Sequence, residues 1–198
     1  YIQSVVKNNN YIYVVGTDSV EYFYDAANAS GSPLARNDSA VVQFGTEAPS
    51  TVVQTEKEVL FVGNTANGGR TVWMLDGFKQ TEIGTESVNQ NLDVMGSLIN
   101  QAYAYCVRSM GHKFYVLTTL DRTWVWDFDE KIWHEWSSGL TQTVFQGRYV
   151  CNSPFGAPFF LVVNSTYLYI FDPFHYVDDG PGVINMQITT VKLDFDSV

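Results

Sequence analysis

The amino-acid sequence predicts an all-β fold made of antiparallel, propeller-like blades. Aromatic residues make up 15% of the 198-residue chain, and such side chains, like Val, Thr and Ile, pack well on a pleated sheet. Pairs of apolar segments joined by short turns recur along the chain, as in repeated β-hairpins. Corresponding positions lie 48, 55 and 45 residues apart, at Tyr11, Val59, Phe114 and Phe159. Propeller blades repeat at about 40 to 50 residues, so the chain is expected to hold about four of them.

Each repeat contains one predicted hairpin, because Asn, Gly, Asp and Ser residues supply turns between two runs of β-forming residues. The four hairpins span Tyr11 to Asp25, Glu58 to Gly77, His112 to Asp129 and Ala157 to Asp172. Further strands are expected at Ser39 to Phe44, Ser50 to Thr55, Gln101 to Arg108, Gly147 to Asn152 and in the terminal run NMQITTVKLDF. They form blade-like units at about 1–50, 51–100, 101–150 and 151–198. Because the chain starts YIQSVV and looks like an excerpt, residues 1–198 are expected to be one partial propeller domain, a fragment of a larger propeller.

Two segments break the strand pattern. Apolar residues recur at helical spacing at Val88, Leu92, Met95 and Ile99. This period predicts one short connector helix near 86–99, with Thr85 or Ser87 capping its start. The stretch from Ala26 to Ser39 is rich in Gly, Ser and Pro, and is expected to form an exposed loop. That loop is either a flexible tip or a docking site for a partner protein.

The charge balance limits the possible partners. The formal net charge is −10, with only 11 Lys and Arg residues, which are scattered along the chain. Proteins that grip nucleic acid need clustered basic residues, so contact with DNA is expected to be indirect at most. The acidic surface either makes the chain soluble or keeps DNA from adhering as it moves past. No apolar run approaches the length of a membrane span, and no membrane partner is expected.

Cysteines and histidines are too few and too scattered for the usual metal or redox motifs. Cys106 and Cys151 lie in strand-like runs without CxxC or His spacing, and are expected to be buried free thiols. None of the three histidines has a second His or Cys at ligand spacing. His112 and His134 could meet across a hairpin, but a histidine hydrogen-bonded between aromatic residues is favoured. No metal and no cofactor is therefore expected.

Carboxylates present the strongest case for catalysis. They cluster at Asp127, Asp129, Glu130 and Glu135, with a second acidic pair at Asp178 and Asp179. A pair of carboxylates could cleave a glycosidic bond. Asp127, however, ends a predicted strand at the place where Asp25, Asp76 and Asp172 end theirs. A repeated Asp at this place is typical of a turn in which the carboxylate accepts backbone N–H groups, so no catalytic residue and no enzyme is predicted.

Ordered motifs in the middle of the chain resemble a known protein family. A GH-x-FY strand, a TW-x-x-D strand and a WHE ending follow one another within the run from Gly111 to Trp136. In this order they resemble the packaged DNA stabilisation proteins, also called head-closure or tail accessory proteins, of short-tailed bacteriophages. The residues of these motifs are expected to be structural; they are Gly111, His112, Phe114, Tyr115, Trp124, Asp127, Trp133 and His134.

The resemblance implies a structural virion protein that works through protein–protein contacts. Such a protein seals the filled capsid below the portal and connects it to the tail. The implied partners are the portal or adaptor ring, the tail needle or other tail proteins, and further copies of the chain in a sixfold ring. The implied location is the head–tail junction of the virion, with the host cytoplasm during assembly.

Two other interpretations remain open at this stage. One is a carbohydrate-binding or glycoside-cleaving propeller, in which Trp126, Trp133 or Trp136 would stack on sugar rings. Burial of these side chains in the blade core is favoured instead, because aromatic residues bury large areas. The other is a Kelch-like adaptor, suggested by the run TWVWDFDEKIW, although regular paired glycines at the start of each blade are missing.

Overall fold

The structure is a computed structural model, and it describes residues 1–138, 143–152, 158–162, 167–170, 177–178 and 182–183. Antiparallel strands dominate these residues, and each larger sheet runs in chain order. The first sheet comprises β1 (Ile2–Asn8), β2 (Tyr11–Gly16), β3 (Val20–Asp25) and β4 (Leu34–Arg36). The second comprises β5 (Val53–Gln54), β6 (Glu58–Asn64), β7 (Arg70–Asp76) and β8 (Lys79–Glu82).

The later part of the chain repeats this arrangement. The third sheet comprises β9 (Tyr103–Ser109), β10 (His112–Thr118), β11 (Thr123–Asp127), β12 (Ile132–Ser138) and the short β13 (Thr143–Val144). The fourth comprises β14 (Gly147–Cys151), β15 (Phe159–Val162) and β16 (Leu168–Ile170), and β17 (Val177–Asp178) pairs with β18 (Gly182–Val183). Four small antiparallel sheets in succession confirm the predicted all-β, blade-like architecture.

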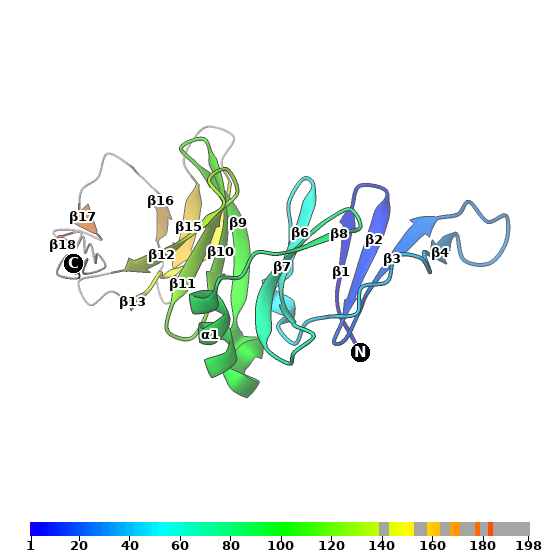
Figure 1. The fold of residues 1–198 in the computed structure, drawn as a ribbon. Coiled ribbons are helices and arrows are strands. Elements are labelled where there is room, and N and C mark those ends of the chain that lie inside the picture. The colour runs from blue at the N-terminus through cyan, green and yellow to red at the C-terminus, as the bar shows by residue number, and fades with distance from the viewer. Residues whose placement is uncertain (139–142, 153–157, 163–166, 171–176, 179–181, 184–198) are drawn as a thin grey trace, which may run out of the picture.

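The four larger sheets follow one another in chain order (Figure 1), and apolar side chains fill the spaces between them. Strand β6 shows how one sheet serves two interfaces. Val59 and Phe61 pack toward the first sheet, whereas Leu60 and Val62 pack toward the third. Successive side chains of a strand point to opposite faces. A sheet that is covered on both faces therefore needs the unbroken apolar run seen in β6.

The first strands of neighbouring sheets lie close together. Strand β1 contacts β5, β5 contacts β9, and β9 contacts β14. The sheets therefore converge on the side of their first strands, which is the arrangement of blades around a propeller axis.

The helical connector lies between the second and third sheets. Helix α1 (Glu86–Val94) is followed by the 3-10 helix η2 (Gly96–Gln101), close to the predicted 86–99. Val88 and Leu92 are fully buried against both sheets. Thr85 is the N-cap residue, as one of the two predicted positions, but its side chain makes no capping hydrogen bond. The apolar face of α1, rather than a strong cap, attaches it to the core.

Asn91 connects this helix to the third sheet. Its side-chain oxygen accepts hydrogen bonds from Trp124 Nε1 and from the Thr119 hydroxyl, both at 2.9 Å. Asn is a poor helix former. Its place in α1 is explained by these tertiary hydrogen bonds, which the sequence does not reveal.

The structure corrects several predicted elements. Residues Ser39 to Phe44 form no strand; they make a single bridge, between Val42 and Val20, as the chain crosses to the second sheet. Within Ser50 to Thr55 only β5 is a strand, because Pro49 opens the 3-10 helix η1 (Pro49–Thr51) instead. Part of the predicted loop from Ala26 to Ser39 pairs with β3 as strand β4.

Besides β4, six strands were not predicted, namely β1, β8 and β12 and the two-residue strands β13, β17 and β18. The expected burial of both thiols is also wrong, since Cys106 is half-buried but Cys151 is exposed. The run NMQITTVKLDF and Asp172 lie outside the described residues. No helix in the described part of the chain is long and apolar enough to cross a membrane.

Candidate functional site

The motif residues of the run Gly111 to Trp136 all belong to the third sheet. Gly111 lies in the two-residue turn between β9 and β10, together with Met110, and both have positive φ, at 84° and 50°. Two successive residues with positive φ are typical of the tight turns that suit the twist of a hairpin. His112 then opens β10, and Asp127 ends β11. The registered pairing of β10 with β11 brings these two ends together.

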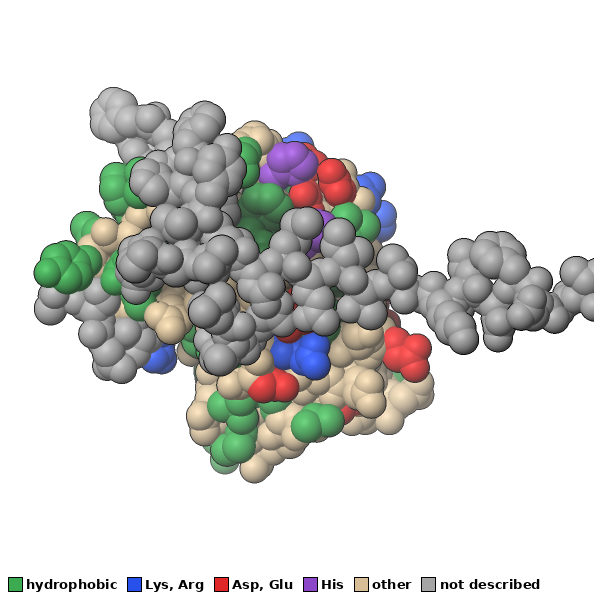
Figure 2. All heavy atoms as spheres, turned by 90° about the vertical axis from the view of Figure 1, so that its left-hand side faces the viewer, with side chains coloured by type: hydrophobic (Ala, Val, Ile, Leu, Met, Phe, Trp, Pro, Cys, Tyr) green, Lys and Arg blue, Asp and Glu red, His purple; other side chains and the backbone are tan. Residues whose placement is uncertain are grey.

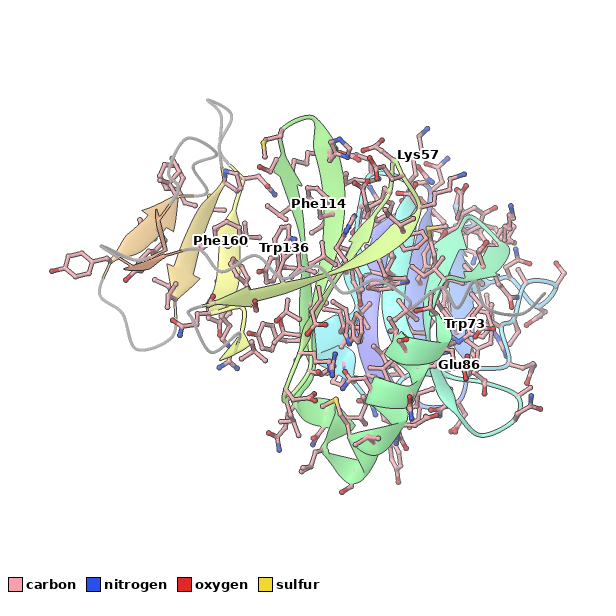
Figure 3. All side chains as sticks on the ribbon, turned by 60° about the vertical axis from the view of Figure 1, so that its left-hand side comes forward. Lys57, Trp73, Glu86, Phe114, Trp136 and Phe160 are labelled. Carbon is pink, nitrogen blue, oxygen red and sulfur yellow. The ribbon has the colours of Figure 1, made fainter. Side chains whose placement is uncertain are left out.

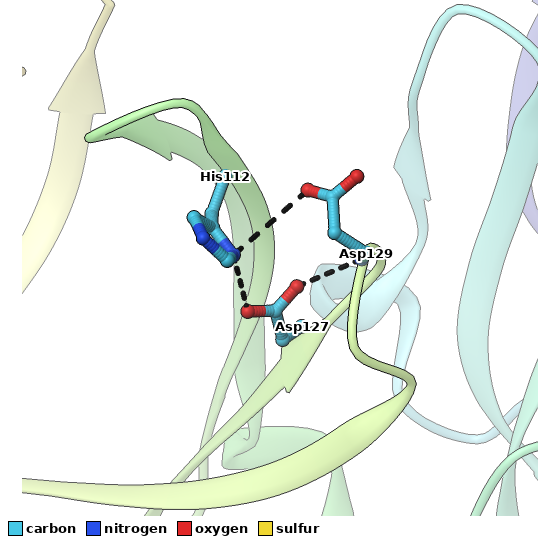
Figure 4. Close-up of side chains that lie close together, drawn as sticks. All are labelled: His112, Asp127 and Asp129. Atoms are coloured by element: carbon cyan, nitrogen blue, oxygen red, sulfur yellow. Dashed lines mark hydrogen bonds and ion pairs between the residues drawn. The ribbon is translucent and has the colours of Figure 1, made fainter.

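Asp127 is the centre of a polar network at this edge of the sheet (Figure 4). Its carboxylate is almost fully buried, and its Oδ2 lies 2.7 Å from Nδ1 of His112. Its Oδ1 accepts hydrogen bonds from the backbone N–H groups of Asp129, at 2.8 Å, and Glu130, at 3.2 Å. The carboxylate of Asp129 in turn accepts the backbone N–H of Lys113 at 3.3 Å. The network therefore joins the β11–β12 turn to the start of β10.

The electrostatics of this network favour an ion pair. Burial raises the pKa of Asp127, but the two backbone N–H groups and His112 together outweigh it, so that the pKa is lowered. The hydrogen bond and the charge of Asp127 raise the pKa of His112. Both shifts favour the charged forms, and each group stabilises the charge of the other.

A comparable role was predicted from the repeated Asp residues at strand ends. Asp25, which ends β3, accepts the backbone N–H of Ala27 at 2.9 Å, as the turn role requires. Asp127 does the same with two amides and adds the bond to His112. The turn role is thus confirmed at these two positions.

The same residues include the groups that could hold a metal ion. His112, Asp127 and Asp129 place one ligand atom each within 4.8 Å of one another, and so do Asp127, Glu130 and His134. Histidine and acidic side chains also gather on the face shown in Figure 2. Nitrogen and carboxylate ligands of this kind suit Zn²⁺. Both oxygens of Asp127, however, already accept hydrogen bonds, so the geometry observed is that of a turn-stabilising network.

The aromatic residues of the motifs connect the third sheet to its neighbours. Trp133 Nε1 donates to the carbonyl of Ile83 at 2.7 Å, and the hydroxyl of the fully buried Tyr115 donates to the carbonyl of Thr51 at 3.0 Å. Trp126 is 8% exposed and packs in the same interface. All five tryptophans lie among the described residues, and none is exposed. Trp126 belongs to the core and the other four pack, partly buried, against the clusters between sheets, which agrees with the predicted packing role rather than with an open platform for sugars.

The other face of the third sheet has its own aromatic cluster. Phe114 stacks on His112 at a centroid distance of 5.8 Å and meets Trp136 edge-on at 5.6 Å. Trp136 also meets Phe145, which packs edge-on against Phe160 of the fourth sheet. Figure 3 shows Phe114, Trp136 and Phe160 between these two sheets. His112 thus combines a hydrogen bond to Asp127 with one aromatic neighbour, close to the predicted role.

A second polar site, which the sequence did not indicate, lies where the first strands converge. A groove of about 690 Å³ is lined by residues 52–56 around β5, by several residues of β9, and by Lys113 and Asn152. Lys113 Nζ lies 3.0 Å from the carboxylate of Glu58, and Arg108 forms an ion pair with Glu56. Burial raises the pKa of Glu58. The hydrogen bonds from the Thr55 hydroxyl and Lys113, with the charge of Lys113, lower it by more, so the net shift of the pKa is downward.

Asn152 occupies the free edge of β9 in this groove. Its side chain accepts the backbone N–H of Arg108 at 3.1 Å and donates to the carbonyl of Cys106 at 3.4 Å. An amide side chain that pairs in this way replaces a strand partner and protects a sheet edge. The two basic side chains of the groove, Arg108 and Lys113, are thus each paired with a carboxylate of the second sheet.

The fold and the site together define a class of protein. The antiparallel sheets pack on one another in chain order like the blades of a propeller. The motif residues form turns and contacts between sheets, which is typical of a structural protein. A family model described as "Bacteriophage P22 Gp10, beta-propeller" matches residues 1–159. The chain belongs to this family of phage DNA stabilisation proteins, which are components of the virion. No curated protein sequence matches the chain significantly.

The match confirms the resemblance inferred from the sequence motifs. All eight motif residues lie within the matched range, and so do the first three sheets. Members of this family are structural stabilisation proteins of phages, and this role implies contacts with other virion proteins.

Proposed function

We propose that this protein closes the DNA-filled phage head: it seals the capsid below the portal and connects it to the tail. The family match over residues 1–159 carries the proposal. The binding partners are the portal or adaptor ring on one side and the tail needle or other tail proteins on the other. Several copies assemble into a ring, with sixfold symmetry as in the family it resembles.

The charge and the contacts of the described residues support a role without catalysis. The cluster around Asp127 is held by three hydrogen bonds from its own turn and from His112, which favours a structural role for the carboxylate. The net charge of −10 disfavours tight binding to DNA. DNA retention is therefore attributed to a physical seal made by protein contacts.

Reconstitution with DNA-filled capsids that lack tails tests this function. The purified protein is incubated with such capsids, and attachment is measured by co-sedimentation and DNA retention by nuclease protection. We expect the protein to co-sediment and the fraction of protected DNA to rise. Heat-unfolded protein at the same concentration is the control. Failure of the folded protein either to attach or to reduce leakage contradicts the proposal.

A glycan array and a reducing-sugar assay test the carbohydrate alternative. No specific observation in the structure favours it, because the tryptophans that would stack on sugars are packed between sheets. Specific glycan binding that is lost on mutation of an exposed tyrosine such as Tyr149 would restore that interpretation.

A further inference from the structure

Two overlapping groups of histidine and acidic side chains surround the turn between β11 and β12. The first group, His112, Asp127 and Asp129, already forms the hydrogen bonds of the turn network in Figure 4. The second group consists of Asp127, Glu130 and His134, whose ligand atoms lie within 4.8 Å of one another. Within the part of the chain that the structure describes, no hydrogen bond or ion pair engages the side chain of Glu130 or His134. Both side chains are therefore available to a ligand.

Strand register and the turn bring these two side chains to Asp127. His134 lies opposite Val125 in the pairing of β11 with β12. It therefore points to the same face of the sheet as Asp127, which is two residues beyond Val125. The backbone N–H of Glu130 donates to Oδ1 of Asp127 at 3.2 Å, which holds Glu130 beside that carboxylate. Three residues from two strands and their turn thus converge.

The carboxylate of Asp127 has room for one more partner. A carboxylate offers about four lone-pair sites on its two oxygens. Three of these sites accept hydrogen bonds, from the imidazole of His112 and from the backbone N–H groups of Asp129 and Glu130. The remaining site can bind a cation. The three hydrogen bonds fix the orientation of this almost fully buried carboxylate, as hydrogen bonds to the ligands of metal sites do.

Charge and distance favour a cation in the second group rather than the first. Residues 127–131 carry three carboxylates and one lysine, so negative charge exceeds positive charge in the turn. In the first group, Nδ1 of His112 lies 2.7 Å from Oδ2 of Asp127. Two ligand atoms of a tetrahedral zinc ion lie farther apart, at about 3.3 Å. His112 is therefore the hydrogen-bond partner of a ligand and not itself a ligand.

We propose that Asp127, Glu130 and His134 bind one divalent cation of the zinc type, with water completing its coordination. An imidazole nitrogen with two carboxylates suits Zn²⁺ or Co²⁺ better than Mg²⁺, which takes oxygen ligands. Ligand distances of about 2.0 to 2.2 Å keep the ligand atoms of one ion within about 4.4 Å of one another. Glu130 and His134 are exposed, so rotation of their side chains reaches this geometry without moving the core. The ion fastens the turn to β12, a role that goes beyond the proposed function and does not rest on it.

Zinc titration of the full, untagged chain tests the site. All proteins carry Cys151→Ser, because an exposed thiol also binds Zn²⁺. Calorimetry after removal of metal with a chelator measures the number of ions and their affinity. In this background, Glu130→Gln and His134→Ala each remove one ligand. Glu135→Gln is the matched control, since it makes the same change of charge in β12 at a carboxylate that pairs with Arg122.

We expect one Zn²⁺ per chain, a higher melting temperature with Zn²⁺, and no competition from Mg²⁺ at the same concentration. Glu130→Gln and His134→Ala are each expected to weaken binding by more than about tenfold, whereas Glu135→Gln leaves it unchanged. Circular dichroism verifies that each variant is folded. Three results overturn the proposal: no binding of Zn²⁺, equal losses in Glu130→Gln and Glu135→Gln, or full binding in His134→Ala. The second result indicates a general effect of charge, and the third places the ion elsewhere.

Discussion

Replacing Asp127 with alanine removes the acceptor that holds one end of the third sheet together. The buried carboxylate accepts two backbone N–H groups of its turn and the imidazole of His112. Alanine keeps the backbone and creates no clash, so the loss of these bonds is the main perturbation. Unlike a change in the apolar core, this substitution tests the polar network alone.

The structure sets the expected magnitude. A hydrogen bond to a charged group contributes about 1.5 to 3 kcal/mol. The N–H groups of Asp129 and Glu130 lie in an exposed turn, where water replaces part of what is lost. We therefore expect Asp127→Ala to lower the free energy of unfolding by about 2 to 4 kcal/mol.

Urea denaturation followed by tryptophan fluorescence measures this change, with circular dichroism as the second probe of a single transition. Asp25→Ala is the matched control, because Asp25 makes the same kind of turn with one exposed bond. Its expected loss is below about 1 kcal/mol. A loss at Asp127 no larger than that at Asp25 would refute the assignment of Asp127 as the structural centre of this edge.

Three further predictions concern pH, thiol reactivity and a buried hydroxyl. The pKa of Asp127 is lowered, so the stability that its carboxylate gives the fold is lost as pH falls through that pKa. The pKa of His112 is raised, so the ion pair is lost as pH rises through the pKa of His112. The stability difference between wild type and Asp127→Ala is therefore expected to peak between these two pKa values; urea titrations from acid to alkaline pH check this, and a flat profile contradicts it. Cys151 is expected to react with a thiol reagent at mildly alkaline pH well before Cys106, because burial raises the pKa of Cys106 to about 11; mass spectrometry of the labelled peptides measures the order, and equal rates contradict it. Tyr115→Phe is expected to lower the free energy of unfolding by about 1 to 2 kcal/mol, because the buried carbonyl of η1 loses its donor; an unchanged urea midpoint contradicts this.

Local patterns in the sequence were enough to place the main hairpins. Strands β2 and β3 begin and end where the runs YIYVVG and VEYFYD predict. The patterns failed where burial comes from another sheet. The ring of Phe44 stacks on Trp73 of the second sheet at a centroid distance of 3.9 Å, although its segment pairs with β3 at only one bridge. Burial between sheets requires no ladder of hydrogen bonds, so apolar residues alone do not distinguish a strand from a crossing loop.

The candidate site was predictable only where its contacts join residues that are close in sequence. Repeated Asp residues at strand ends indicated a turn role for Asp127, since an Asp and the amides that follow it are neighbours in sequence. Its bond to His112, 15 residues earlier, depends on the register between β10 and β11. The groove lined by Val53, Lys113 and Asn152 combines residues from three sheets and has no signature in any one segment.

The sequence by itself determined the class of fold, the repeat and the family, because turn residues, β-forming runs and ordered motifs are all local in the chain. Only the tertiary structure decided which surfaces are joined and which remain free. Alternation within a strand assigns side chains to two faces, but whether a face is covered depends on the sheet beside it. The buried Val116 and the exposed Leu161 both lie in short apolar strands, and among the described residues a neighbouring sheet covers Val116 but not Leu161.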